Sequence, residues 1–183
     1  MLFATTVTTS EELQQIYDLS FQNLRTNISK EETEKEGFTS WQYSLELLQQ
    51  LHSLQPSVIV KDDEKVIAYA LVALMESRVF HKDLETFMRG LSKLLYNEKL
   101  LSEYKFYGMG QICIHKDYRG IGVFPMLYNH HKELFQHKFD FVVTDISTNN
   151  PRSIRAHEKV GFKTIYTYTD ATDEWNVVVW NWK

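Results

Sequence analysis

Residues 112–127 read ICIHKDYRGIGVFPML, an apolar strand that continues through two glycines into a helix. Gly120 and Gly122 permit a tight turn, and they let a ligand approach the backbone without a side chain in the way. The helix that begins near Phe124 leaves its first amides without partners. Because these amides lie at the positive end of the helix dipole, the stretch is typical of a phosphate or pyrophosphate site.

A second block strengthens this interpretation, since a two-glycine turn alone occurs in many strand–helix connections. After an apolar run at residues 139–144, residues 145–162 read DISTNNPRSIRAHEKVGF. Asn150 precedes a short helical segment that ends at Gly161 and Phe162. The order and spacing of the two blocks carry more information than either block alone.

The two blocks resemble the GCN5-related N-acetyltransferase (GNAT) superfamily. Residues 119–124 are similar to its coenzyme A loop, which has Arg or Gln, two variable residues, Gly, one variable residue, and then Gly or Ala. Phe124 departs from the last of these positions. Asn150 and the pair Gly161-Phe162 match the two ends of the family's second block, and His157 stands where most members have a tyrosine.

The resemblance implies an α/β fold with an α+β layout. We expect a mixed, mostly antiparallel central sheet of about seven strands, flanked by helices, in a single domain over residues 1–183. The expected strands are residues 2–8, 57–61, 66–75, 108–114 and 139–144, a segment ending at Tyr168, and residues 175–182.

Local patterns predict the helices of the first half. A capping box at residues 9–12 opens one helix. Residues 39–42 repeat the pattern, with Phe38 and Tyr43 as a hydrophobic staple, and predict a second helix to about Leu54. The polar residues 27–36 between them mix both signs of charge, which indicates a solvated turn or a frayed helix end.

An insertion at residues 76–104 predicts an extra helix between the third and fourth strands. Its apolar residues recur at helical spacing. They are Leu84, Phe87, Met88, Leu91, Leu94 and Leu95. Such a helix either packs on the sheet or forms a wall or lid over the acceptor pocket.

Composition limits the partners and the compartment. The chain has 183 residues, of which 43% are hydrophobic, enough for a full core. One cysteine excludes an internal disulfide, and no cysteine–histidine cluster has zinc spacing, so we expect a reducing compartment and no metal. A net charge of −4 without a basic stripe argues against nucleic acid. Because neither a membrane-spanning run nor a signal-peptide pattern is present, we expect a cytoplasmic protein with no membrane partner.

The resemblance implies acetyl-coenzyme A as the co-substrate. Its pantetheine arm would pair, like an extra strand, with the backbone of Ile112, Cys113 and Ile114. Gly108 and Gly110 weaken this strand, so we expect a bulge that opens the sheet there. The other residues expected to bind the cofactor are Arg119, Gly120, Ile121, Gly122, Val123, Phe124 and Asn150.

The acceptor needs a base, because a free primary amine is mostly protonated at pH 7 and cannot attack in that form. Asp145 ends the strand that leads into the second block, where some amine-acetylating family members have a glutamate, and it is the first candidate. The alternative for Asp145 is a solvated strand-end carboxylate that only shapes a turn. Glu76, at the end of another strand, is the reserve candidate.

The departing thiolate needs a proton or a hydrogen bond, which a tyrosine supplies in most family members. His157 stands at that position, and an imidazole can donate as the cation or as a neutral tautomer. A smaller family branch, which acetylates free amino acids and similar compounds, has a histidine there too. The alternative is a structural histidine, the commoner role of a lone histidine on a helix.

Cys113 is a poor candidate for a covalent acyl carrier, because burial in an apolar strand keeps a thiol protonated. We therefore expect direct transfer through a ternary complex. A backbone N–H of residues 112–114 would stabilise the tetrahedral intermediate.

These observations predict an N-acetyltransferase that moves an acetyl group from acetyl-coenzyme A to a primary amine of a small molecule or peptide, with Phe38 and Tyr43 in the acceptor wall. The departures at Phe124 and His157 leave an alternative, an idle relative that binds acyl-coenzyme A as a sensor or partner-binding module. A doubly wound nucleotide-binding fold is disfavoured, since its glycine loop follows the first strand. The closing strand, residues 175–182, has an edge through which a homodimer could form.

Overall fold

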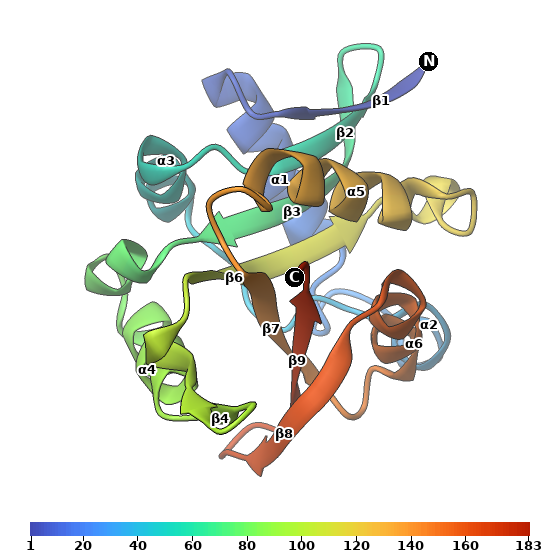
Figure 1. Cartoon of the computed structure of the whole chain (residues 1–183). Helices are drawn as coiled ribbons and strands as arrows, with labels where there is room; N and C mark the ends of the chain where they lie inside the picture. Colours follow the sequence, from blue (N-terminus) through green and yellow to red (C-terminus); the bar gives the residue numbers. More distant parts are fainter.

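A seven-stranded sheet runs through the computed structural model, which describes residues 1–183 (Figure 1). The strands are β1 (Leu2–Thr6), β2 (Val58–Asp62), β3 (Lys65–Ala73), β6 (Phe106–Ile114), β7 (Phe141–Ser147), β8 (Lys163–Thr169) and β9 (Glu174–Asn181). They lie in the order β1-β2-β3-β6-β7-β9-β8, and every neighbouring pair is antiparallel except β6 and β7. The predicted mixed, mostly antiparallel sheet is confirmed.

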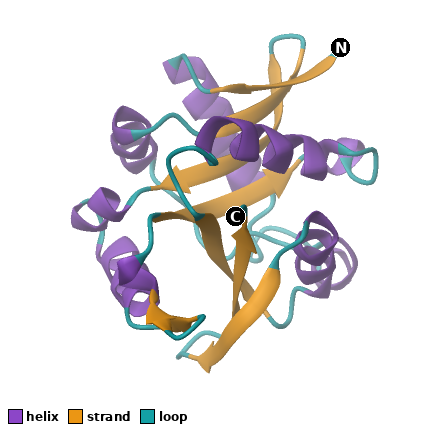
Figure 2. Ribbon diagram, viewed as in Figure 1, coloured by secondary structure: helices purple, strands orange, loops and turns teal.

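Helices cover both faces of this sheet (Figure 2). They are α1 (Ser10–Gln22), α2 (Lys30–Glu36), α3 (Leu45–Leu54), α4 (Lys82–Ser92), α5 (Val123–Phe135) and α6 (Pro151–Val160). Buried side chains of α1, α3 and α4 form one core cluster with one face of the sheet. Buried side chains of α5 form a second cluster with the opposite face, and partly buried side chains of α6 pack against it. None of the helices combines the length and the apolar composition that a membrane crossing needs.

The first helix begins as predicted, whereas the second does not. The Thr9 hydroxyl accepts from the Glu12 amide at 3.2 Å, and the Glu12 carboxylate accepts from the Thr9 amide at 3.1 Å. The expectation that residues 39–42 open a helix is wrong: α3 begins at Leu45 and is capped by Ser44. Hydrogen bonds to the chain after α1 hold Thr39 in an extended segment instead, and residues 30–36 form a short helix of their own.

The extra helix between the third and fourth strands of the main sheet is also present, as α4, with Leu84, Met88 and Leu91 buried. It ends three residues earlier than the apolar stripe suggested. A tight turn with φ of 48° at Asn97 and 67° at Glu98 draws Leu95 into a small hairpin. The hairpin consists of β4 (Leu95–Tyr96) and β5 (Lys99–Leu100). Short 3₁₀ helices cover Met75–Val79, Leu101–Glu103 and Lys116–Tyr118.

The sheet opens between its two parallel strands. β6 and β7 pair only from Phe106 and Phe141 to Gly108 and Val143, and they then run apart (Figure 1). The register between β3 and β6 shifts at the same level, where Ala70 faces Ile112 but Val72 faces Met109. The predicted bulge is therefore confirmed. It leaves the second half of β6 with a free edge toward β7.

Gly110 and Tyr43 stabilise this bulge together. The Tyr43 hydroxyl donates to the Gly110 carbonyl at 3.1 Å, and the Tyr43 ring is buried. A Cβ atom on residue 110 would lie 2.8 Å from the Tyr43 oxygen, which is closer than real Cβ contacts come. Because the ring is held in the core, it cannot move away freely.

We expect Gly110→Ala to lower the free energy of unfolding by roughly 1–3 kcal/mol, since the added methyl group overpacks a buried contact. Gly90→Ala is the matched control, because its Cβ would meet nothing within 4 Å on α4. That change should raise stability by ~0.5–1 kcal/mol, as alanine is the better helix former. Urea unfolding of both variants checks this, and equal stabilisation by the two would contradict the tight contact at residue 110.

Candidate active site

The loop between β6 and α5 is arranged to bind an anion. Gly120 and Gly122 have φ of 79° and 92°, which residues with side chains rarely adopt. Gly122 precedes α5 and supplies no side-chain cap. Every amide from Gly120 to Phe124 donates to no atom of the protein. A row of free amides at the positive end of a helix is a ready site for phosphate oxygens.

This loop faces a cleft of about 600 Å³ that continues along the free edge of β6. Most residues predicted for cofactor binding line it, and so does Phe38. They are Ile112, Cys113, Ile114, Arg119, Gly120, Gly122, Val123, Phe124 and Asn150. Ile121 is not among the lining residues, and its side chain is exposed. No residue of α4 lines the cleft, so α4 packs on the sheet and is not a wall of this cleft.

Three further groups of lining residues were not predicted, and the smallest consists of Pro125 and Asn129 of α5. One face of α6 contributes residues at helical spacing, a pattern visible in the sequence: Arg152, Ser153, Arg155, Ala156, Lys159 and Val160. The third group comes from the residue after α1, the last residue of α2 and the segment that follows α2: Asn23, Glu36, Gly37 and Thr39. No local signal marks that group, because tertiary contacts alone bring it to the cleft.

The charged side chains around the loop are mostly cationic. Arg119 donates from Nε to the Ile114 carbonyl at 3.0 Å and from a terminal nitrogen to the Asn23 side-chain oxygen at 2.5 Å. Arg152, Arg155 and Lys159 add positive charge from α6. Glu36 is the one acidic residue in the lining. The cleft therefore attracts anions more strongly than the net charge of the chain suggests.

Asn150 joins α6 to the segment that closes the cleft. Its side-chain oxygen accepts from the Ser153 amide at 3.2 Å and so caps α6. Its side-chain nitrogen donates to the Phe38 carbonyl at 3.3 Å. We call residues 37–43, which run from α2 toward α3, the strap. Gly37 starts the strap with φ of 78°, and a Cβ there would lie 2.8 Å from the Asn150 oxygen.

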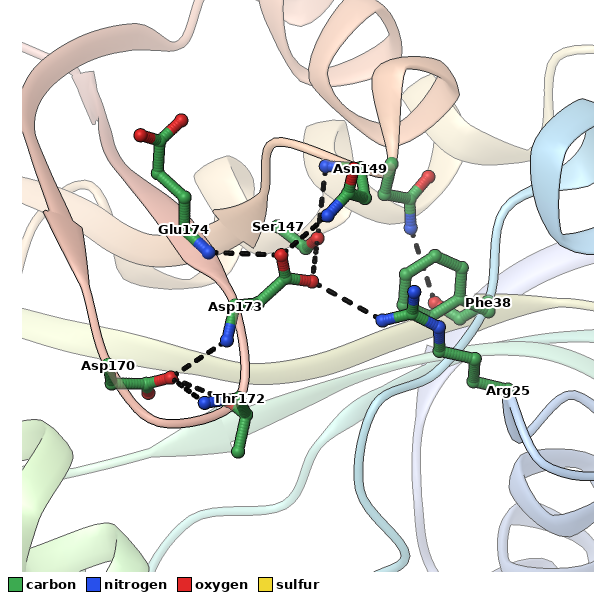
Figure 3. Close-up of polar contacts among 9 residues, drawn as sticks. Arg25, Phe38, Ser147, Asn149, Asp170, Thr172, Asp173 and Glu174 are labelled. Atoms are coloured by element: carbon green, nitrogen blue, oxygen red, sulfur yellow. Dashed lines mark hydrogen bonds and ion pairs between the residues drawn. The ribbon is translucent and has the colours of Figure 1, made fainter.

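The Asp173 carboxylate, in the turn between β8 and β9, connects that turn to the strap side of the cleft (Figure 3). One oxygen accepts from the Ser147 hydroxyl at 2.5 Å and from Arg25 at 3.4 Å. The other accepts from the Asn149 side chain at 2.6 Å and from the Glu174 amide at 3.0 Å. Burial alone would raise the pKa of Asp173, but these hydrogen bonds outweigh it and lower the pKa below its ordinary value.

Arg25 extends this network to the strap, because its guanidinium lies 4.9 Å from the centre of the Phe38 ring. A cation over an aromatic face adds attraction to the packing of the two side chains. The turn between β8 and β9, the end of β7 and the strap are thus held in one arrangement around the cleft.

His157 lies behind the wall of the cleft and does not line it. It is buried, with Nε2 2.6 Å from the Tyr128 hydroxyl and Nδ1 2.8 Å from the Ser153 carbonyl. Burial lowers its pKa to about 4, against the opposing hydrogen bond to Ser153. The ring is therefore neutral, with Nδ1 donating to Ser153 and Nε2 accepting from Tyr128. Its ring centre lies 4.9 Å from that of Phe124, which does line the cleft.

Asp145 and Tyr43 lie outside the cleft, toward the face of the sheet that α1, α3 and α4 cover. Side chains alternate along a strand, so Asp145 shares this face with Val143, which belongs to the same core cluster as Tyr43. Asp145 is half-buried and accepts from the Tyr168 hydroxyl at 2.7 Å. Burial raises its pKa, although the Tyr168 hydrogen bond opposes the shift.

Two other predicted candidates can also be placed. Glu76 lies in a 3₁₀ helix and lines a separate pocket with Met75 and Arg78, away from the cleft. Burial raises the pKa of the Cys113 thiol to about 12. A thiol that stays protonated is a poor nucleophile, as the sequence indicated.

Comparison with known proteins identifies solved structures with a similar fold. Among curated proteins, none matches the sequence. The solved structure of the ribosomal-protein-S18-alanine N-acetyltransferase from Escherichia coli is similar with a TM-score of 0.61 at 14% identity, over 99% of this chain and 94% of that one. The structure of NAA60 from Arabidopsis thaliana in complex with acetyl-CoA is similar with a TM-score of 0.63 at 12% identity, over 99% of each chain. The structure of Ard1 from Thermoplasma volcanium is similar with a TM-score of 0.65 at 12% identity, over 98% of this chain and 97% of that one.

At these identities the structural likeness establishes the fold. The family assignment comes from the sequence profile of the Acetyltransferase (GNAT) family, which matches residues 11–162. This match spans most of the chain and includes both the glycine loop and the second block. The chain therefore belongs to the GNAT acetyltransferase family.

Proposed function

We propose that this protein transfers an acetyl group from acetyl-coenzyme A to the primary amine of a small molecule or peptide, by direct transfer within one domain over residues 1–183. The observation that supports this most is the row of unpaired amides from Gly120 to Phe124, which faces a cationic cleft. Membership of the GNAT family and the fold shared with N-acetyltransferases point the same way.

The residues of the cleft fit a nucleotide thioester. Bound acetyl-coenzyme A supplies the activated acetyl group. The amides from Gly120 to Phe124 would hold its pyrophosphate, with Arg152 and Lys159 nearby as counter-charges. The free edge of β6, residues 110–114, offers backbone donors and acceptors to the pantetheine arm. A cleft of about 600 Å³ is within the size range of small-molecule sites.

We infer that the acceptor approaches from the opposite face of the sheet, where Asp145 lies beside the opening between β6 and β7. The strap links the two sides, because Phe38 lines the cleft and the Tyr43 side chain belongs to the core cluster on the opposite face. Burial makes the Asp145 carboxylate a better proton acceptor than a solvated one. Asp145 would remove the proton from the amine, directly or through water.

His157 fits a positioning role better than direct proton donation. Its donor nitrogen already binds the Ser153 carbonyl, and its acceptor nitrogen binds the Tyr128 hydroxyl. Through its contact with Phe124 it fixes one part of the cleft lining. A donor role toward the leaving thiolate would need these hydrogen bonds to break.

The first test is cofactor binding followed by acetyl transfer. We expect coenzyme A to raise the melting temperature, because a ligand that binds only the folded state stabilises it. Gly122→Glu should abolish the shift by placing a carboxylate in the anion site. Gly122→Ala carries the same backbone strain without the charge, and it should keep most of the shift. A silent titration at ~1 mM coenzyme A would overturn the proposed function.

Amine-dependent release of free thiol from acetyl-coenzyme A, measured over a panel of small amines and peptides, then separates an enzyme from an idle relative. If the protein binds acetyl-coenzyme A but no amine of the panel causes release of free thiol, the idle acyl-coenzyme A sensor is favoured.

Replacing the carboxylate of Asp145 tests the base. We expect Asp145→Asn to lower kcat by ~10²-fold or more, with little change in KM for acetyl-coenzyme A. Asp83→Asn is the control, since Asp83 is an exposed carboxylate at the start of α4. If the Asp145→Asn variant has the kcat of the wild type, Asp145 is not the base and only shapes the turn at the end of the strand.

The burial of His157 predicts an acid-sensitive fold. Because its pKa falls from 6.5 to about 4 on folding, its contribution to stability is complete above pH 6.5 and is lost as the pH falls toward 4. We expect a loss of roughly 2 kcal/mol from this group between pH 7 and pH 5. His157→Gln keeps a donor and an acceptor and should lose less stability over that range. The exposed His137→Gln is the control, and identical pH dependence of all three proteins would contradict the assignment.

A further inference from the structure

α2 is an acidic helix placed at the edge of a cationic cleft. Its sequence is KEETEKE, with four glutamates and two lysines, and none of its residues is buried. Figure 1 shows it beside α6. A helix of seven residues has little stability of its own in water, and α2 gains none from a buried apolar face. Polar contacts must therefore hold it in place.

The last residue of the helix makes contacts with two arginines. The Glu36 carboxylate accepts from Arg119 at 3.3 Å and, through the same oxygen, from Arg152 at a shorter distance. Arg152 also donates to the Lys35 carbonyl at 3.2 Å. We call Glu36, Arg119 and Arg152 the Glu36 clasp. All three residues line the cleft that contains the free amides of the glycine loop.

Within the clasp, the Glu36 carboxylate has the same kind of partners as a bound phosphate. An anionic oxygen between two guanidinium groups is what a cofactor phosphate would present to the same arginines. Glu36 is the single acid in the lining, so no second carboxylate competes for this position. In addition, Arg119 leads directly into the glycine loop and is fixed there by the Ile114 carbonyl.

We propose that the Glu36 carboxylate occupies the place of a cofactor phosphate in the free protein, and that a phosphate of coenzyme A displaces it. This inference rests on the proposed function. Displacement releases α2 from the cleft, since the helix has no buried side chain to retain it. The strap follows directly after Glu36 and carries Phe38, so loading of the cofactor changes the freedom of the acceptor wall. Glu36 thereby couples the two substrates.

Competition of this kind lowers the apparent affinity for the cofactor, because only molecules with an open clasp bind it. Glu36→Gln keeps the size of the side chain and removes its charge. We expect this variant to bind coenzyme A ~10-fold more tightly than the wild type by isothermal titration calorimetry. Glu34→Gln removes the same charge from the same helix, but Glu34 contacts only Lys30, at 4.0 Å. This control should stay within about twofold of the wild type, because distant exposed charges are screened.

Pantetheine, which lacks the phosphates, separates displacement from a general change in the cleft. Its affinity should be the same for wild type, Glu36→Gln and Glu34→Gln. Hydrogen–deuterium exchange of residues 30–36 provides a second readout. Exchange there should be faster in Glu36→Gln than in the wild type, and saturating coenzyme A should raise the wild-type rate to that of the variant.

The outcomes distinguish the inference from the proposed function. If the wild type binds coenzyme A and Glu36→Gln binds it equally or more weakly, the clasp does not compete and the inference is overturned. Slower exchange of α2 in the presence of coenzyme A would overturn it too, since the helix would then close on the cofactor. If none of the three proteins binds coenzyme A, the proposed function itself fails, and the inference fails with it.

Discussion

The separation of β6 from β7 is the constraint on which the rest of the site depends. Buried backbone groups normally stay paired, because an unpaired N–H or C=O is expensive away from water. Here the pairing stops at Gly108 and Val143, and the Thr144 hydroxyl makes the last connection by donating to the Met109 carbonyl at 2.9 Å. Past that point β6 has a free edge, the glycine loop faces the same space, and Asp145 lies beside the opening from the other face. The bulge that Gly110 and Tyr43 stabilise keeps this opening in place.

Around that opening, segments far apart in the sequence supply the charge. Arg119 donates a hydrogen bond to Asn23, which lies 96 positions earlier in the sequence. Arg152 donates to Glu36, which lies 116 positions earlier. The buried Asp173 carboxylate brings the end of β7 and the turn after β8 to Arg25, next to the strap. These contacts join the end of α1, the end of α2, the glycine loop, α6 and the turn after β8 around one cleft. Glu36 is the one acidic group among the cleft residues that these contacts connect.

The two departures from the common family pattern lie in contact with each other. The Phe124 ring, at a position where the family has Gly or Ala, packs edge-on against His157, which replaces the common tyrosine. Tyr128 supplies a hydroxyl in the same cluster, as the partner of His157. Burial of this cluster keeps the imidazole neutral. The pair is therefore best understood as one packing unit behind the cleft wall.

The sequence by itself determined the elements whose signals are local: the Thr9 capping box, the glycine turn, the apolar stripe of α4 and the bulge that Gly108 and Gly110 mark. It also located most of the cleft lining that β6 and the glycine loop supply, because those residues are close together along the chain. Only the tertiary structure decided where α3 begins, since contacts to the end of α1 hold Thr39 extended. Tertiary packing also turned His157 away from the cleft and brought Glu36 to Arg119 and Arg152. Such outcomes depend on which distant groups compete for the same space and hydrogen bonds, and no local pattern encodes that competition.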